Sequence, residues 1–366
     1  MSSDVKFEGW AGMDEHACEG KLEFQSFTPK RWDEDDVDVK ILYCGICGSD
    51  ASALSGEWGP VKDVCPQICG HEIVGEVVRA GSKVDNGIKV GQIVGIGPQS
   101  DSCRECEWCH TGEENLCPNQ TMTFNAPYRR GEGKGSISRG GFAKYWRGPS
   151  RFAIPVPQGL DPALAAPMMC GGVTVYSPLA RFGAGTTAKK VGVIGVGGLG
   201  HFGIMFAKAM GAEVTAISRG DGKKDDAVTM GASKYIATGS NLRENFKGHE
   251  RSLDLIICTI NPPELPVADY IPLLRPRGHM VLVGAVVTPL QVPAFPLIVG
   301  ASSISGSNIG SPNELKAMMQ FAVEHNVKPW VERWDMNDIN SAMPAFKEGK
   351  PRYRYVLVNT ENGGRM

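Results

Sequence analysis

The sequence feature that most constrains the fold is a glycine-rich loop between a strand-like and a helix-like segment. Residues 190–194, Lys-Val-Gly-Val-Ile, are typical of a short buried strand, and residues 195–200 continue as Gly-Val-Gly-Gly-Leu-Gly. The loop fits the G-x-G-x-x-G pattern of dinucleotide-binding sites, which needs a preceding strand and a following helix. Gly195 would make the tight turn, Gly197 would let the backbone approach a pyrophosphate, and Gly200 would let helix and strand pack closely.

The helix that this loop opens would present free backbone N–H groups to the phosphates, with Gly198 and Leu199 at its start. A glycine-rich turn without a ligand is the alternative interpretation. Further patterns alternate around the loop, with strands at 190–194, 213–217, 253–258 and 279–283 and helices at 198–210 and 224–230. Such alternation predicts an α/β fold in which a parallel sheet carries helices on both faces.

The chain has 366 residues, which is long enough for about two domains. Before about residue 160 it carries short strand patterns, such as 37–42 and 72–78, separated by glycines. This texture predicts a twisted, partly closed β domain. A helix at 312–325 and a closing strand at 354–358 indicate that the chain then returns to the first domain. We therefore expect a first domain at 1–162, a cofactor domain at 163–305 and a returning segment at 306–366.

The composition excludes several classes of protein. The formal net charge of −2 and the lack of a basic stripe argue against a nucleic-acid partner. We find no apolar run of the ~18 residues that a bilayer requires, and the polar N-terminus lacks the apolar core of a signal peptide. A cytoplasmic location is therefore the expectation. The eleven cysteines are an odd number in a long chain, which favours metal binding over a disulfide framework.

The choice between nicotinamide cofactors depends on the end of the second strand of the parallel sheet. Sites selective for NAD place a carboxylate there, which binds the ribose 2′-hydroxyl. Here the strand runs into Ser218 and Arg219, with Lys223 close behind. A hydroxyl and a guanidinium suit a 2′-phosphate, whereas a carboxylate would repel it. The sequence therefore predicts NADP(H), the alternative being that Arg219 is a solvated surface charge.

Four cysteines lie within fifteen residues as Cys103-x2-Cys106-x2-Cys109-x7-Cys117. This spacing is typical of a closed tetrahedral zinc site with four thiolate ligands and no position for water. Its role would be structural, because metal binding can hold together a lobe that has little core of its own. An iron–sulfur cluster is the alternative, but nothing else in the chain indicates electron transfer.

A second candidate metal site is dispersed along the chain and consists of Cys47, His71 and Cys170. A catalytic zinc ion takes three protein ligands and keeps one open position. Cys170 lies near the junction of the two expected domains, where a ligand would place the metal beside the nicotinamide. Taken singly, each of these residues has a structural interpretation as well.

Several motifs resemble the zinc-dependent medium-chain dehydrogenase superfamily, and in particular its cinnamyl alcohol dehydrogenase branch. Gly70-His71-Glu72-x2-Gly75-x5-Gly81-x2-Val84 fits the zinc signature of that superfamily without a gap. Four further stretches resemble that branch: residues 44–50, 170–178 and 216–219, and Arg352-Tyr353-Arg354. The resemblance covers essentially the whole chain. It implies a GroES-like catalytic domain, a Rossmann cofactor domain and a homodimer.

The resemblance also implies roles for individual residues. Cys47, His71 and Cys170 would bind a catalytic zinc ion, with Glu72 as an alternate ligand and Asp50 orienting the His71 ring. Thr174 would lie near the nicotinamide, and Ser307, Asn308 and Ile309 would meet its carboxamide. Together with the four-cysteine site, this predicts two zinc ions per subunit.

The implied activity is hydride transfer between NADP(H) and an aldehyde or primary alcohol, mainly as an aldehyde reductase. The candidate substrate pocket consists of Trp58, Trp108, Met122 and Ile309, which would favour aryl or medium-chain aldehydes. Trp58 has a core aromatic as its alternative interpretation.

One position departs from the family pattern. Ser49 keeps the hydroxyl that would pass on the alcohol proton, but Ser52 stands where many relatives carry a relay histidine. Two other functions therefore stay open: an NADPH-dependent reductase of iminium or conjugated C=C bonds, and a non-catalytic NADP-binding structural protein.

Overall fold

Two separate sheets organise the chain, one in each of two units defined by their contacts. The computed structural model describes residues 5–84 and 86–366. The first unit comprises Met1–Cys170 together with Gly310–Met366, and the second comprises Gly171–Ile309. The predicted limits were instead 162/163 and 305/306. The first boundary was hard to locate in the sequence because Cys170 lies inside an apolar helical run, Pro162–Arg181, that continues into the second unit.

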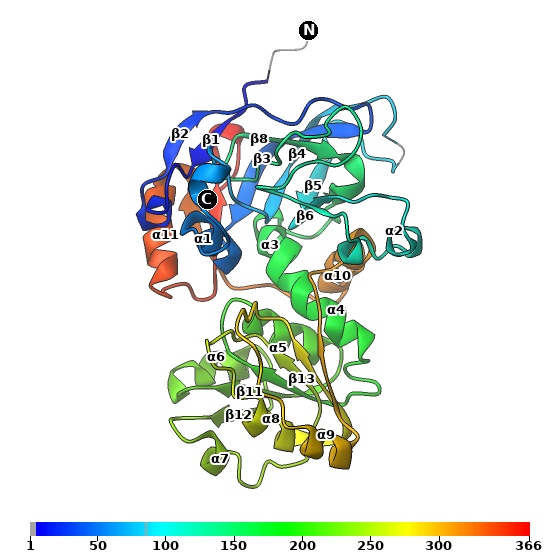
Figure 1. The fold of residues 1–366 in the computed structure, drawn as a ribbon, viewed down its shortest axis with the longest axis vertical. Coiled ribbons are helices and arrows are strands. Elements are labelled where there is room, and N and C mark those ends of the chain that lie inside the picture. The colour runs from blue at the N-terminus through cyan, green and yellow to red at the C-terminus, as the bar shows by residue number, and fades with distance from the viewer. Residues whose placement is uncertain (1–4, 85) are drawn as a thin grey trace. The chain divides into compact units, whose positions relative to one another are not determined.

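The second unit is built on a six-stranded sheet whose neighbouring strands are all parallel. Its order is β12-β11-β10-β13-β14-β15, which is 3-2-1-4-5-6 when counted from β10. This doubly wound order is the Rossmann fold and confirms the predicted class. The strands are β10 (Lys190–Ile194), β11 (Glu213–Ser218), β12 (Lys234–Ala237), β13 (Leu253–Cys258), β14 (Leu274–Leu282) and β15 (Ser303–Gly306). The helices are α4 (Val173–Arg181), α5 (Gly200–Ala209), α6 (Lys224–Thr229), α7 (Leu242–Asn245), α8 (Val267–Tyr270) and α9 (Ala294–Gly300) (Figure 1).

The central strands of this sheet are apolar along their length because helices cover both faces. Val191, Val193, Leu255 and Ile257 are fully buried. The predicted strands and helices are present, with small differences at their ends. The largest concerns β14, which begins at Leu274 rather than at His279 because its first residues, despite Pro276, already follow the strand path.

The first unit contains a curved sheet in the order β16-β17-β3-β4-β5-β9, with β8 also paired to β3. The ten-residue strand β3 pairs with β4 along its length, with β8 at its start and with β17 at its end. Because β3 has three partners and two register shifts, the sheet curls into the partly closed barrel that was predicted. The strands are β3 (Asp36–Gly45), β4 (Ile73–Ala80), β5 (Ile93–Ile96), β8 (Tyr145–Pro149), β9 (Ile154–Pro155), β16 (Val331–Asp335) and β17 (Arg354–Val358).

The described part of this unit also contains two short ribbons, five α-helices and several 3₁₀ turns. The ribbons pair β1 (Glu8–Ala11) with β2 (Glu23–Ser26) and β6 (Gln99–Asp101) with β7 (Thr121–Met122). The helices are α1 (Gly48–Leu54), α2 (Glu107–Thr111), α3 (Pro162–Pro167), α10 (Pro312–Glu324) and α11 (Ile339–Lys347) (Figure 1). The C-terminal segment therefore returns to the first unit, where β17 pairs antiparallel with β3.

One helical run among the described residues is long and apolar enough to cross a membrane. It spans Pro162–Arg181, with a mean hydropathy of 1.3. The expectation that no apolar run reaches ~18 residues was therefore wrong, because small and apolar residues continue through α3, a π-helical turn and α4. However, 83% of the apolar window is buried within the protein. The run therefore has the character of a core helix and is weak support for a membrane span.

Candidate functional site

Four side chains that could bind a metal converge in the first unit: Cys47, His71, Glu72 and Cys170. All four are buried, and their ligand atoms lie within 4.8 Å of one another. The Sγ atoms of Cys47 and Cys170 are 3.9 Å apart although 123 residues separate them in the chain. The structure therefore brings together every residue predicted for the dispersed site.

The Asp50 carboxylate places two of these ligands. Asp50 lies in the first turn of α1, and its Oδ2 accepts the backbone N–H of Cys47 at 2.9 Å. Its Oδ1 accepts the backbone N–H of Gly70 at 2.9 Å and lies 2.9 Å from His71 Nδ1. This contact engages Nδ1, so Nε2 is the ring nitrogen that would bind a metal. Although burial opposes a charged ring, the Asp50 carboxylate raises the pKa of His71 above its usual range.

The peptide before His71 requires glycine. Gly70 has a φ of +94°, which favours glycine, and a Cβ there would lie 2.8 Å from Cys44 Sγ and from the Phe142 backbone nitrogen. Gly45 is restricted by space alone, since a Cβ there would lie 2.0 Å from Glu72 Oε2 and 3.1 Å from Glu72 Cβ. These two glycines let the end of β3 and the start of β4 approach closely enough to bring their ligands together.

Glu72 forms a buried ion pair that sequence analysis missed. Arg354 Nη2 donates to Glu72 Oε1, and both side chains are almost completely buried. The other carboxylate oxygen, Oε2, is buried without a hydrogen-bond partner. Burial raises the pKa of Glu72 to about 7, against the opposing charge of Arg354. The only sequence signal for Arg354 was its place in the Arg352-Tyr353-Arg354 motif.

The donor set fits a zinc ion. Hydrogen bonding between the two thiols lowers the pKa of Cys47 and raises that of Cys170, so one sulfur is readily deprotonated. Two sulfurs, one ring nitrogen and a carboxylate oxygen without a partner are the ligand types that zinc takes. Zinc bound there would convert both thiols to thiolates, and their two negative charges would offset the charge of the metal.

Two further side chains lie beside this cluster. Ser49 Oγ is 3.9 Å from Cys47 Sγ, so the structure places the predicted proton carrier at the cluster. The ring of Phe124 lies 5.6 Å from the His71 ring, a contact that sequence analysis missed. No local pattern identifies Phe124, because it reaches His71 only through the folding of the β6–β7 ribbon.

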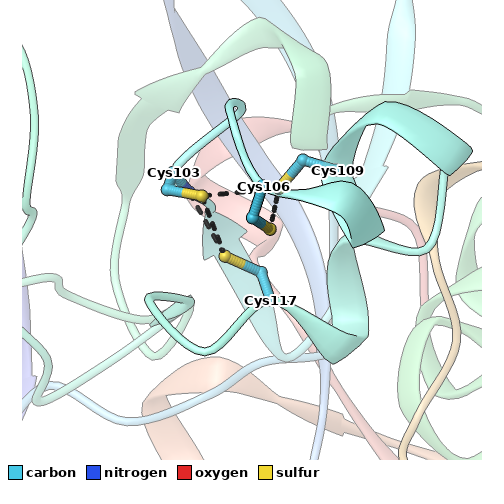
Figure 2. A group of neighbouring side chains, drawn as sticks. All are labelled: Cys103, Cys106, Cys109 and Cys117. Carbon is cyan, nitrogen blue, oxygen red and sulfur yellow. Dashed lines mark hydrogen bonds between the residues drawn. The ribbon is translucent and has the colours of Figure 1, made fainter.

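The four remaining candidate ligands form a second cluster, shown in Figure 2. Cys103 and Cys117 have their sulfurs 3.5 Å apart, Cys106 and Cys109 likewise, and Cys103 and Cys109 3.9 Å apart. The backbone N–H of Glu105 lowers the pKa of Cys103 to about 7, which favours the thiolate. Four convergent sulfurs fit the closed zinc site predicted from the spacing.

The glycine loop lies in the second unit, between β10 and α5. Gly195 has a φ of +89°, and a Cβ on Gly200 would lie 1.7 Å from the Gly195 carbonyl oxygen. A Cβ on Gly197 would meet no atom within 4 Å, so this glycine borders open space that a pyrophosphate could fill. The loop therefore shows the three distinct glycine environments that dinucleotide binding requires.

The other predicted cofactor residues also belong to the second unit. Ser218 ends β11, Arg219 follows with an exposed side chain, and Lys223 Nζ donates to the Val196 carbonyl oxygen at 2.7 Å. This bond brings Lys223 beside the glycine loop. The remaining residues are Thr174 on α4 and Ser307, Asn308 and Ile309 directly after β15.

The predicted pocket residues are more exposed than core residues. Trp58 is 51% exposed, which contradicts its alternative interpretation as a core aromatic. Trp108 lies on α2 between two cysteines of the four-cysteine cluster, and Met122 lies on β7, two residues before Phe124. These three belong to the first unit and Ile309 to the second. Their role in substrate binding stays a prediction.

Comparison with known proteins identifies the family. Residues 33–158 match the alcohol dehydrogenase GroES-like domain, and residues 198–324 match the zinc-binding dehydrogenase family. The chain is 41% identical to 8-hydroxygeraniol dehydrogenase of Catharanthus roseus, over 96% of this chain and 95% of that protein. It is 38% identical to NADP-dependent alcohol dehydrogenase 6 of Saccharomyces cerevisiae, over 98% of both.

Two solved structures agree with this assignment. A cinnamyl alcohol dehydrogenase from Sorghum bicolor matches with a TM-score of 0.89 and 36% identity over 99% of both chains. A cinnamyl alcohol dehydrogenase from Helicobacter pylori, complexed with NADP(H), matches with a TM-score of 0.86 and 30% identity over 98% of this chain and 99% of that one. The chain therefore belongs to the zinc-dependent medium-chain dehydrogenase superfamily. Within it, the chain belongs to the cinnamyl alcohol dehydrogenase branch of alcohol dehydrogenases.

The buried ion pair gives a first prediction. Arg354→Met should destabilise the first unit by about 3 kcal/mol, because it leaves the Glu72 carboxylate buried without its cation. All seven tryptophans lie in the first unit, so the urea midpoint of tryptophan fluorescence reports on that unit. Replacing both partners, Arg354→Met with Glu72→Met, should recover most of the loss. A single variant as stable as the unchanged protein would contradict a structural role for the pair.

Proposed function

We propose that this protein is a zinc-dependent aldehyde reductase that uses NADPH. The observation that carries the proposal is the buried cluster of Cys47, His71, Glu72 and Cys170, which retains every ligand the chemistry needs. A non-catalytic structural protein would have no need to keep two thiols, an imidazole and an unpaired carboxylate oxygen together in a buried site.

The residues of the cluster have separate tasks. Zinc, when bound by Cys47, His71 and Cys170, supplies a Lewis acid that stabilises negative charge on a substrate oxygen, and bound NADPH supplies the hydride. Asp50 holds His71 in the tautomer whose Nε2 can bind the metal. Ser49, beside Cys47, holds the proton that the product alcohol requires. Arg354 neutralises one oxygen of Glu72 and leaves the other available.

The preference for NADPH is supported by the residues after β11. Ser218 and Arg219 replace the carboxylate that an NAD site would carry, and Lys223 adds a second cation near the glycine loop. The yeast relative is named as NADP-dependent, and the H. pylori structure contains NADP(H). We infer that Ser218, Arg219 and Lys223 bind the 2′-phosphate.

The proposed substrates are aryl aldehydes of the cinnamyl type or medium-chain aldehydes. The exposed side chains of Trp58 and Met122 would provide an apolar and aromatic surface for such substrates. A second candidate function is NADPH-dependent reduction of iminium or conjugated C=C bonds. Ser52 favours it, because this residue stands in α1 where a relay histidine would assist proton transfer to an alkoxide.

We further propose a cytoplasmic homodimer formed through one apolar face of the second unit. Residues 286–301 contain no charged side chain. Leu290 and Leu297 pack onto the core, whereas Phe295 and Ile298 are 74% and 72% exposed. The adjacent strand β15 is an outer strand of the sheet, so one of its edges is free to pair. An uncharged face tolerates contact with an identical copy across a two-fold axis.

Metal analysis tests the catalytic proposal. The purified protein should contain about two zinc ions per chain, and a chelator should abolish NADPH-dependent reduction of cinnamaldehyde or hexanal. Cys47→Ala should lose activity and one zinc ion, whereas Cys65→Ala, outside both clusters, should keep both. Full activity of a protein that holds no zinc at Cys47, His71 and Cys170 would refute the mechanism. Reduction of iminium or conjugated substrates, but not of aldehydes, would favour the second candidate function.

Arg219→Asp tests the choice of cofactor. A carboxylate at this position would repel the 2′-phosphate and accept the ribose hydroxyl, so the ratio of kcat/KM for NADPH to that for NADH should fall at least ~10-fold. Lys234→Asp, an exposed lysine on β12, is the matched control and should leave the ratio unchanged. An unaltered preference in the Arg219 variant would show that this arginine is only a surface charge.

Sedimentation tests the proposed dimer. The unchanged protein should sediment at twice the 39.3 kDa mass of the chain. Phe295→Glu combined with Ile298→Glu should yield monomers, because each copy would bring buried charges to the interface. Val228→Glu, at an exposed apolar position on α6, should remain dimeric. A dimer that survives the double substitution would place the interface elsewhere.

A further inference from the structure

The β6–β7 ribbon connects the two cysteine clusters of the first unit. At one end, β6 leads into Cys103 and β7 follows Cys117, so the four-cysteine lobe closes the ribbon. At the other end, Gly97 precedes β6 and the residues Thr123 and Phe124 follow β7. Phe124 lies beside His71 of the buried cluster, and the proposed chemistry gives neither residue a role.

Thr123 fastens this end of the ribbon next to Cys170. Its backbone N–H donates to the Pro98 carbonyl oxygen at 2.8 Å, and its hydroxyl donates to the carbonyl oxygen of Gly97. Thr123 is fully buried. A Cβ on Gly97 would lie 2.8 Å from the Met169 carbonyl oxygen, so Gly97 packs directly against the residue before Cys170. Thr123 thus holds the segment that packs against the Met169 backbone, one residue before Cys170.

The next residue, Phe124, contacts the ring of His71. The centroids of its ring and the His71 ring are 5.6 Å apart, with the planes inclined at 48°. Asp50 Oδ1 contacts the His71 ring at Nδ1, 2.9 Å away. The ring of His71 is therefore contacted both by a carboxylate and by an aromatic ring.

The lobe end of the ribbon is also anchored. Gln99 Nε2 donates to the Glu114 carbonyl oxygen at 2.8 Å, which ties β6 to the lobe. The Asp35 carboxylate contacts Arg104 at 2.7 Å and Arg130 at 2.8 Å, and Arg130 also pairs with Asp101. Both ends of the ribbon are therefore held by contacts with neighbouring segments.

We propose that Thr123 and Phe124 are positioning residues that set the geometry of His71 and Cys170 for metal binding. Thr123 acts through Gly97 and Met169 on Cys170, and Phe124 acts on the His71 ring. This inference rests on the proposed zinc site, but its test measures metal binding rather than turnover, so it does not depend on the identity of the substrate.

The decisive comparison is Thr123→Val against Thr123→Ser in the full-length protein. Valine keeps the shape of threonine without the hydroxyl, whereas serine keeps the hydroxyl. Cobalt is loaded in place of zinc, its visible absorption spectrum is recorded, and the affinity of the buried site is measured by competition with a chelator. Thr123→Val should bind metal about 10-fold more weakly, with a shifted cobalt spectrum, and Thr123→Ser should restore both.

Thr121→Val is the matched control. Thr121 is equally buried on the same ribbon, but its hydroxyl donates to the Pro127 carbonyl oxygen at 3.2 Å. This variant should keep the metal affinity and the spectrum of the unchanged protein. NADPH binding, which involves the second unit, should be equal in all variants. An equal loss of affinity in Thr121→Val and Thr123→Val would indicate general destabilisation and overturn the proposal.

Phe124→Leu gives an independent test if Thr123→Val does not fold, because Phe124 is only partly buried. Loss of the aromatic contact should shift the cobalt spectrum and lower kcat more than it raises KM. Phe124→Tyr, which keeps an aromatic ring, should retain the cobalt spectrum and the kcat of the unchanged protein. An unchanged spectrum in Phe124→Leu would overturn its assigned role. Failure of the unchanged protein to bind metal at the buried cluster would instead refute the proposed function itself.

Discussion

The geometry of the candidate site depends on the contacts of one carboxylate, that of Asp50. It accepts hydrogen bonds from the backbone of Cys47 and of Gly70 and contacts the ring of His71. One buried side chain therefore holds the start of α1, the peptide that leads into β4 and the ring of a candidate metal ligand. Removing it would leave three polar groups without an acceptor, and each such group costs about 1–3 kcal/mol when buried. The geometry of the cluster is built outward from this carboxylate.

The C-terminal return of the chain completes the same site. Arg354 lies on β17, 282 residues after Glu72, and reaches it because β17 pairs with the end of β3. The pairing places a buried guanidinium against a buried carboxylate, which is tolerable only because each neutralises the other. The first unit is thus discontinuous in sequence, and its last strand supplies the guanidinium that opposes the rise in the pKa of Glu72 caused by burial.

The two cysteine clusters show why one site was readable in sequence and the other only in part. The sulfurs of Cys103 to Cys117 converge through a short lobe, so their spacing already implies a common centre. Cys47, His71 and Cys170 were grouped by ligand type and by family resemblance, because no local rule relates positions so far apart. The contacts of Arg354 and Phe124 were missed: the motif that contains Arg354 gives it no partner, Phe124 lies in no motif, and both residues reach the cluster only through folding.

The sequence by itself determined the parts of this protein that depend on neighbouring residues. These are the glycine loop at 195–200, the alternation of strands and helices, the four-cysteine lobe and the replacement of an acid by Ser218 and Arg219. Only the tertiary structure decided that Asp50 would hold two ligands at once, that Glu72 would meet Arg354 and that the β6–β7 ribbon would contact His71. The physical reason is range: glycine geometry and ligand spacing act over a few residues, whereas burial and charge pairing depend on segments that only folding brings together.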